Sequence, residues 1–194
     1  MVYYFTYFLT KFLSFLLAPR QAEGRRNIPL KGAFVLASNH ISNLDPPLLG
    51  ISTTRRLHYM AKAELFKHPF WGWWLRELWA FPIKRGEADF GALKQALAIL
   101  KKGEPVLLFP QGTRAIHGKE DKPLPGAGFL VQKARVPVVP VYVSGSDKAM
   151  PPGSKRIYRH KVKVIFGESF IVPYHLSYEE ASQYILKRIQ ALAP

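Results

Sequence analysis

The fold is decided by residues 33–51, AFVLASNHISNLDPPLLGI, where two apolar runs flank a polar turn. The first run has the length and composition of a buried strand, which we expect over residues 33–38. Asp45 precedes two prolines and the second apolar run. An aspartate before proline favours a helix start, because its carboxylate caps the first amides and proline fits the first turn. We therefore expect a strand, a turn and then a helix over residues 46–52.

The turn places a histidine near an aspartate. His40 ends the predicted strand and Asp45 precedes the predicted helix, so a short turn can bring imidazole and carboxylate within hydrogen-bond reach. A carboxylate that fixes one ring nitrogen leaves the other free to take a proton from a hydroxyl. On this spacing alone, a helix cap beside a surface histidine is an equally good interpretation.

Another polar motif follows a further predicted strand and favours the catalytic interpretation of His40 and Asp45 over the helix cap. Residues 109–114, FPQGTR, come directly after an apolar run, which predicts a strand over residues 105–109. Two weaker motifs are FPIKR at residues 81–85 and VPVVPV at residues 136–141. In chain order FPQGTR is therefore the third of four motifs, here called the third motif. The ordered set of motifs is much more specific than the histidine–aspartate spacing by itself.

Over residues 30–145 these motifs resemble the glycerolipid acyltransferase family, and they are most similar to its bacterial 1-acyl-sn-glycerol-3-phosphate acyltransferases. Two residues depart from the family pattern: Gln111 stands where glutamate is usual, and Ala115 where serine is frequent. The resemblance implies an O-acyltransferase that uses a thioester of coenzyme A or acyl carrier protein. The implied acceptor is the free hydroxyl of 1-acylglycerol-3-phosphate, and the product is phosphatidic acid. Glycerol-3-phosphate, a lyso-ornithine lipid or another lysophospholipid are alternative acceptors.

The resemblance also implies roles for individual residues. His40 is then the general base that activates the acceptor hydroxyl, and Asp45 orients it. The acceptor phosphate needs cations, and a guanidinium can bind two of its oxygens at once. The candidates for this role are Arg85, Arg114 and Lys84.

The third motif is expected to form a turn beside the thioester, whose oxygen becomes an oxyanion and needs hydrogen-bond donors. The residues assigned to this oxyanion turn are Gln111, Gly112 and Thr113. No metal is expected, because the histidines outside the motifs are scattered without ligand spacing. No cofactor is expected either, apart from the acyl-CoA or acyl carrier protein co-substrate.

Composition narrows the class of protein. The 194 residues suit a single domain, and 48% hydrophobic content excludes a disordered chain. The absence of cysteine excludes disulfides and a thiol nucleophile. A formal charge of +15 favours an anionic membrane surface, phosphorylated substrates, an acidic carrier or nucleic acid as partners. Nucleic acid is not expected, because no RNA- or DNA-binding signature is present. A non-enzymatic basic binding protein remains the alternative of a different class.

Residues 2–17, VYYFTYFLTKFLSFLL, form an aromatic run in which Lys11 is the only charge. At helical spacing Thr6, Thr10 and Ser14 share one face, and four phenylalanines lie on another. The run is shorter than the ~20 residues that span a bilayer, and it lacks the basic start and cleavage site of a signal peptide. We expect an interfacial helix that makes the protein monotopic and membrane-associated at the cytoplasmic face. Packing of this helix on the domain core is the alternative.

This helix defines a first unit at residues 1–19, followed by a polar basic link and an acyltransferase domain over residues 27–194. Residues 62–79 hold all four tryptophans, in short helical pieces separated by Pro69 and Gly72. These tryptophans are expected either in the core or on an acyl-chain slot or bilayer-facing wall.

The rest of the chain alternates predicted strands and helices. Further strands are expected at residues 57–60, 80–83, 137–143 and 161–166, and further helices at residues 88–102, 127–134 and 177–192. Pro137 and Pro140 argue against a fully hydrogen-bonded central strand in their segment. This alternation predicts an α/β fold, a single domain with a largely parallel central sheet flanked by helices. Sites in such sheets lie at the carboxyl ends of the strands.

Overall fold

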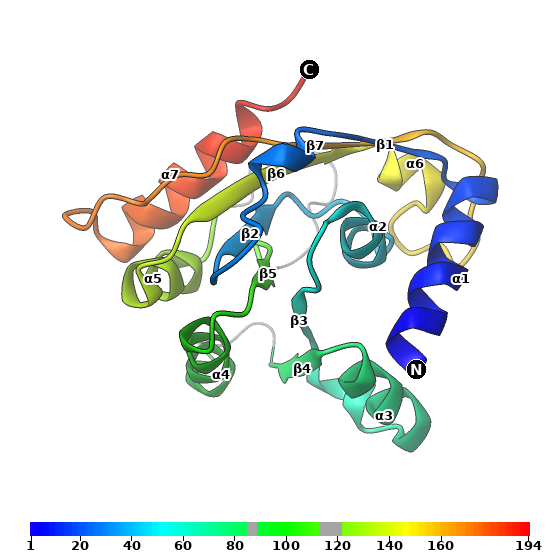
Figure 1. Ribbon diagram of the computed structural model, residues 1–194, viewed down its shortest axis with the longest axis horizontal. Coiled ribbons are helices and arrows are strands. Elements are labelled where there is room, and N and C mark those ends of the chain that lie inside the picture. The colour runs from blue at the N-terminus through cyan, green and yellow to red at the C-terminus, as the bar shows by residue number, and fades with distance from the viewer. Residues whose placement is uncertain (85–88, 113–121) are drawn as a thin grey trace.

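The computed structural model describes residues 1–84, 89–112 and 122–194. Within them the chain forms a seven-stranded sheet of order β1-β7-β6-β2-β5-β3-β4 (Figure 1). Strands β6 and β7 pair antiparallel, and the other neighbouring strands pair parallel. The prediction of a single α/β domain with a largely parallel sheet flanked by helices is confirmed.

The strands are β1 (Arg20–Glu23), β2 (Val35–Ser38), β3 (His58–Lys62), β4 (Ala80–Ile83), β5 (Val106–Leu108), β6 (Val138–Ser144) and β7 (Val162–Phe166). The α-helices are α1 (Val2–Leu17), α2 (Asp45–Ser52), α3 (Pro69–Glu77), α4 (Phe90–Lys101), α5 (Pro125–Ala134), α6 (Ser146–Ala149) and α7 (Tyr178–Gln190). Two short 3-10 helices are η1 (Arg25–Asn27) and η2 (Ala63–Phe66). The predicted break at Gly72 is wrong, because α3 runs through this residue without interruption. The other predicted strands and helices are confirmed with ends displaced by one to a few residues, because element ends depend on caps more than on periodicity.

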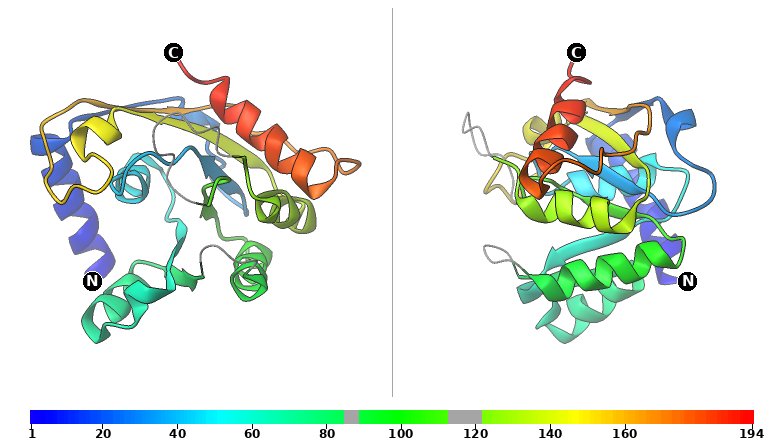
Figure 2. Two further views of the ribbon diagram at one scale, coloured as in Figure 1. Left: turned by 180° about the vertical axis from the view of Figure 1, so that it is seen from behind. Right: turned by 90° about the vertical axis from the view of Figure 1, so that its left-hand side faces the viewer.

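Strand β2 lies inside the sheet and is buried on both faces. Val35 and Ala37 join a core cluster covered by α4, α5 and α7, whereas Leu36 joins a second cluster covered by α2. Figures 1 and 2 show these helices on opposite sides of the sheet, with α1 on the side of α2. A strand covered on both faces reads as a continuous apolar run, which is why the sequence predicted it.

The segment predicted as a polar link contains an edge strand. β1 pairs with β7 in parallel, with Arg20 opposite Val162. The segment is polar as predicted, but the sequence predicts no strand in it. An edge strand pairs on one side and keeps polar side chains, so its sequence lacks the alternation that identifies a half-buried strand. The division into units at residues 1–19 and 27–194 stays a prediction.

Strand β6 lies inside the sheet, between β2 and β7, despite its prolines. The strand is therefore central, although Pro140 leaves its ladder without one N–H donor, as its sequence predicted. Pro140 pairs with Ala37 of β2, and its carbonyl accepts a hydrogen bond from the amide of Gly167 at 2.9 Å. Since β7 ends at Phe166, the proline lies where the antiparallel ladder stops, which is where a strand tolerates a missing N–H.

Helix α1 packs with its hydroxyl face toward the protein. Ser14 is 5% exposed, and Thr6 Oγ1 accepts a hydrogen bond from Nε1 of Trp74 in α3 at 3.0 Å. The opposite face is aromatic, with exposed fractions of 70%, 62%, 61% and 73% for Phe5, Phe8, Phe12 and Phe15. The helix therefore packs on the domain, as the alternative predicted, but only through its hydroxyl face, and its phenylalanine face stays uncovered. Among the helices of the described residues, none combines the length and the apolar character needed to cross a membrane.

Candidate active site

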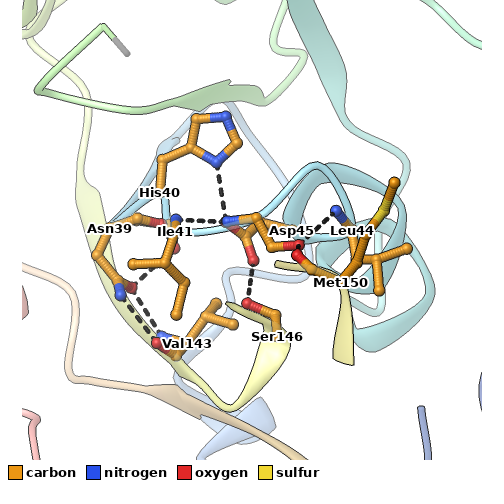
Figure 3. Close-up of polar contacts among 10 residues, drawn as sticks. Asn39, His40, Ile41, Leu44, Asp45, Val143, Ser146 and Met150 are labelled. Carbon is orange, nitrogen blue, oxygen red and sulfur yellow. Dashed lines mark hydrogen bonds and ion pairs between the residues drawn. The ribbon is translucent and has the colours of Figure 1, made fainter. Parts of the chain in front are cut away.

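The turn between β2 and α2 buries a histidine and an aspartate side by side. His40 is 3% exposed and Asp45 is 0% exposed. Nδ1 of His40 lies 2.8 Å from Oδ2 of Asp45 (Figure 3). Since an ionised carboxylate only accepts hydrogen bonds, Nδ1 carries the proton of the neutral ring and Nε2 is left as its basic nitrogen.

The carboxylate of Asp45 accepts further hydrogen bonds from its own turn and from a distant loop. Oδ2 also accepts from the backbone amides of Ile41 and Ser42, at 2.7 and 2.8 Å. Oδ1 accepts from the hydroxyl of Ser146, at the start of α6, at 2.5 Å. Both oxygens are therefore fixed, and the oxygen that faces His40 is held by two rigid donors.

The predicted capping role of Asp45 is wrong. Asp45 is itself the first residue of α2, and its carboxylate turns back onto the preceding turn. The next two residues are prolines, which have no backbone N–H for a cap to accept. The helix start that the sequence predicted is present, but the carboxylate binds the turn and His40.

Two more side chains fix the turn through partners that were not predicted from the sequence. Asn39 pairs with the backbone of Val143 in β6, donating from Nδ2 to the carbonyl at 2.8 Å and accepting at Oδ1 from the amide at 2.7 Å. Ser42 Oγ donates to the carbonyl of Met150 at 2.9 Å. Asn39 could have been noticed because it is adjacent to His40. The partners of Asn39 and Ser42 could not be predicted, because they lie more than a hundred residues away in the chain.

The imidazole contacts the third sequence motif. The ring of His40 stacks on that of Phe109, with centroids 4.1 Å apart and planes inclined by 20°. Phe109 directly follows β5, which pairs with β2 in parallel. The two specific motifs therefore meet at the carboxyl edge of neighbouring strands, as the α/β pattern predicted.

His40 also lines a cavity of about 460 Å³ between α1, α2, α3 and β3. Its walls are mainly apolar and include Ile51, Met60, Leu65, Leu75 and Leu78. Hydroxyl groups of α1 join the lining, and the four tryptophans do not belong to it. The prediction that the tryptophans line a slot is therefore wrong: the leucines beside them do so, while Trp71 and Trp73 are about half exposed.

Tyr59 forms part of the cavity wall and depends on a glycine opposite. A Cβ at Gly50 of α2 would lie 2.3 Å from the Tyr59 hydroxyl, so only glycine fits at this position. Burial raises the pKa of the Tyr59 hydroxyl, which therefore stays neutral and can donate a hydrogen bond at physiological pH.

The third motif turns sharply after β5. The amide of Gly112 donates to the carbonyl of Phe109 at 2.9 Å, and Gly112 has a φ of +69°, a conformation that favours glycine. This amide is thereby occupied within the turn. The side chain of Gln111 has a buried Oε1 that finds no hydrogen-bond partner among the described residues.

Of the other predicted residues, one follows β4, three strands away from β2, and three fall outside the described residues. Lys84 is exposed at the end of β4, and its amide donates to Oδ2 of Asp89 at 2.8 Å. The hydrogen bonds from the amides of Lys84 and Ala92 lower the pKa of the Asp89 carboxyl. Arg85, Arg114 and Thr113 fall outside the described residues. No group of three or more potential metal ligands occurs in the part of the chain that the structure describes.

Fold and site together define an α/β enzyme in which a buried histidine–aspartate pair opens onto an apolar cavity. Residues 20–144 match the acyltransferase family, and the chain belongs to that family.

A 1-acyl-sn-glycerol-3-phosphate acyltransferase of Bacillus subtilis is 35% identical over 147 residues, which are 74% of this chain and 70% of that protein. A lyso-ornithine lipid O-acyltransferase of Pseudomonas aeruginosa is 34% identical over 107 residues, covering 51% of this chain and 41% of that protein. Three other relatives are longer, and the chain spans 41–42% of them.

Among solved structures, the 1-acyl-sn-glycerophosphate acyltransferase PlsC of Thermotoga maritima matches 96% of this chain and 76% of its own. The TM-score is 0.79 and the sequence identity 28%. The resemblance to the glycerolipid acyltransferases and the prediction of an O-acyltransferase are thus confirmed.

Proposed function

We propose that this protein transfers a fatty acyl group from an acyl thioester to the free hydroxyl of 1-acylglycerol-3-phosphate, giving phosphatidic acid. The observation that carries the proposal is the buried His40–Asp45 pair, whose histidine lines a largely apolar cavity. The names of the Bacillus and Thermotoga relatives support this choice of acceptor.

In this mechanism His40 is the general base. Its Nε2 takes the proton of the acceptor hydroxyl as the oxygen attacks the thioester carbonyl, and the Asp45 carboxylate stabilises the imidazolium that forms. When the tetrahedral intermediate collapses, the carbon–sulfur bond breaks and the imidazolium returns the proton to the departing thiolate. A positioned general base typically contributes 10²–10⁴-fold to the rate.

The third motif has a changed role in this proposal. The amide of Gly112 is bonded to Phe109, so the oxyanion role expected for it passes to other groups of the turn, with Thr113 still a candidate. Gln111 is proposed to bind the acceptor, because its buried Oε1 is suited to accept a hydrogen bond from a substrate hydroxyl. A glutamine cannot take a proton as the usual glutamate could, so this role is binding without proton transfer.

The acceptor phosphate is proposed to bind Arg85, Arg114 and Lys84. Strand β4, which precedes Lys84 and Arg85, runs parallel to β3 and ends at the same edge of the sheet as β2. The test compares a phosphorylated acceptor with one that lacks phosphate. Arg114→Ala and Arg85→Ala should weaken the phosphorylated acceptor about ten- to a hundredfold, the usual contribution of a charge-assisted bond. Equal losses with both acceptors would make these arginines structural.

The apolar cavity is proposed to hold a fatty acyl chain. Its volume of about 460 Å³ lies within the range of small-molecule sites, and its wall is mainly apolar; among the described residues that line it, Lys62 is the one with a fixed charge. Each methylene removed from water contributes about 0.8 kcal/mol. Chain length should therefore affect binding strongly until the cavity is full.

Membrane attachment is proposed to occur through α1. Its exposed phenylalanines face away from the protein, which is the reverse of the usual arrangement for a helix in water. A bilayer surface at the cytoplasmic face would cover them, and the two-chain product could leave directly into it. The protein would then be monotopic, with acyl-CoA or acyl carrier protein arriving from the aqueous side.

The decisive experiment incubates the purified protein with a radiolabelled acyl thioester, as coenzyme A and carrier-protein forms, and a panel of acceptors. Phosphatidic acid from lysophosphatidate is expected, and its loss in His40→Ala but not in the exposed control His175→Ala is expected too. Product from lyso-ornithine lipid alone would favour the second candidate, which the Pseudomonas relative supports. No product with any acceptor would overturn the proposal and favour a binding protein.

A further inference from the structure

A strongly basic stretch lies between α6 and β7. The sequence carries no acidic residue between Asp147 and Glu168. Within it, residues 155–161 (KRIYRHK), here called the basic segment, have exposed cations at Lys155, Arg156, Arg159 and Lys161. The proposed reaction uses none of these residues.

The basic segment also exposes two apolar side chains between its cations. Ile157 is 41% exposed and Tyr158 is 52% exposed. The backbone is nevertheless anchored, because the amide of Tyr158 donates to the carbonyl of Ala149 at 2.7 Å. Isolated exposed apolar residues are ordinary on a protein surface, but a pair set among four cations has the composition of an interfacial segment.

The basic segment runs beside the end of α1. The amide of His160 donates to the carbonyl of Leu17 at 3.2 Å, and that of Val162 donates to the carbonyl of Pro19 at 2.9 Å. Figure 1 shows the loop that carries this segment reaching β7 past the end of α1. Near this end of α1, Phe12 and Phe15 are 61% and 73% exposed. The end of α1 and the basic segment are therefore neighbours.

We propose that the basic segment is a second contact with an anionic lipid bilayer, beside α1. Its cations would bind lipid phosphates, while Ile157 and Tyr158 enter the boundary between headgroups and acyl chains. This inference rests on the proposed attachment of α1 to the membrane. A bilayer is the partner that fits, because the basic segment combines exposed cations with exposed apolar side chains and adjoins the end of the helix proposed to lie on the membrane.

The test measures binding to vesicles of phosphatidylcholine with and without phosphatidylglycerol. Each basic residue near an anionic surface contributes about 1 kcal/mol, which is about fivefold in affinity. The double variant Arg156→Gln/Arg159→Gln should therefore bind the anionic vesicles about 25-fold more weakly at low salt. The matched control Lys101→Gln/Lys102→Gln removes the same charge at the end of α4, which covers the other face of the sheet. It should change binding less than twofold.

Three results would overturn the proposal. The first is equal weakening by both double variants, which would reduce the effect to net charge. The second is unchanged vesicle binding of Ile157→Ser/Tyr158→Ser. The third is a raised KM for acyl carrier protein, but not for acyl-CoA, with vesicle binding intact, which would make the basic segment a carrier-protein dock. Acyl transfer to a short-chain soluble acceptor should persist in all these variants, so failure of this inference is distinguishable from failure of the proposed reaction.

A separate observation concerns Ser146. This serine is 0% exposed, and its hydroxyl donates to Oδ1 of Asp45 at 2.5 Å from a loop 101 residues further along the chain. With Oδ1 fixed, the carboxylate cannot rotate away from His40. We infer that Ser146 is a positioning residue for the proposed general base, acting through Asp45.

The test separates positioning from stability. Ser146→Ala should lower kcat of the folded enzyme about tenfold with KM unchanged, the lower end of what a hydrogen bond to a charged group contributes. Ser146→Thr should restore kcat because it keeps the hydroxyl. Ser182→Ala is the control: Ser182 is equally buried, but its hydroxyl joins Gly128 to Leu124, away from the site. A Ser146→Ala enzyme with wild-type kcat would overturn the inference, as would equal loss in Ser182→Ala.

Discussion

Replacing Asp45 by asparagine separates the charge of this side chain from its geometry. The oxygen that faces the turn accepts from the backbone amides of Ile41 and Ser42, which cannot turn away. An amide NH₂ in that place would face two N–H groups, so the asparagine must point its NH₂ at Ser146. The serine hydroxyl can rotate from donor to acceptor. His40 therefore keeps its proton on Nδ1, and the arrangement of the pair survives.

The expected loss of kcat follows from the neutral hydrogen bond that the asparagine would still make to His40. A hydrogen bond to a charged group contributes about 1.5–3 kcal/mol and a neutral one about 0.5–1.5 kcal/mol, so the difference is about 1–1.5 kcal/mol, or tenfold. The imidazolium formed during the reaction also loses an opposite charge beside it. We expect Asp45→Asn to lower kcat between about 10- and 100-fold, less than loss of the base itself. A flipped amide that reversed the histidine tautomer would instead cost about 10⁴-fold, as in another histidine–aspartate system.

The assay follows thiol release from acyl-CoA with a short-chain lysophosphatidate, alongside a thermal melt that verifies folding. Asp147→Asn is the matched control, because it removes the same charge beside Ser146 without touching His40. A loss near 10⁴-fold would refute the argument that the two backbone amides fix the orientation. Wild-type kcat in Asp45→Asn would refute any role for the charge.

Four further outcomes are expected. His40→Ala should lose at least about 100-fold in turnover while the fold survives, and a variant that keeps more than about a tenth of wild-type turnover would exclude His40 as the base. Gln111→Glu should retain activity, and an enzyme many-fold faster than wild type would mean that the natural chain is impaired at this residue. Burial lowers the pKa of the His58 imidazole from its ordinary 6.5, so the unfolded chain binds this proton more readily than the folded chain. The free energy of unfolding should therefore fall as the pH drops below about 6.5. Thermal melts of His58→Gln at several pH values should show a weaker dependence of stability on pH. An unchanged dependence would mean that other groups cause it. A chain that begins at Arg20 should lose salt-resistant vesicle binding, and unchanged binding would exclude α1 as the attachment.

The sequence predicted the elements whose burial is visible in the pattern of side chains. Strand β2 is covered on both faces and reads as AFVLA, and the turn after it carries the histidine and aspartate that meet at 2.8 Å. Local spacing allowed this pairing without deciding it, and the FPQGTR motif after the neighbouring strand made it the favoured interpretation. The parallel order of the strands then brought Phe109 onto His40.

What the sequence could not predict depends on distant contacts. The bond from Ser146 to Asp45 joins residues 101 apart, and nothing in a single serine indicates its partner. The strand β1 carries no apolar alternation because it is an edge, and Pro140 stands inside the sheet because its antiparallel neighbour ends beside it. The cavity likewise needs the packing of α1 against α3, which periodicity does not specify.

Helix α1 is a wall shared by two apolar environments. Its inner face lines the cavity that contains His40, and its outer face is the surface proposed to lie on the bilayer. An enzyme built this way draws its acceptor from a two-dimensional pool. Its velocity should follow the mole fraction of lysolipid in the surface and fall when inert lipid dilutes that surface, even at constant bulk concentration. A detergent monomer able to enter the cavity would act as a competitive inhibitor, so rates measured in micelles would underestimate those on a membrane.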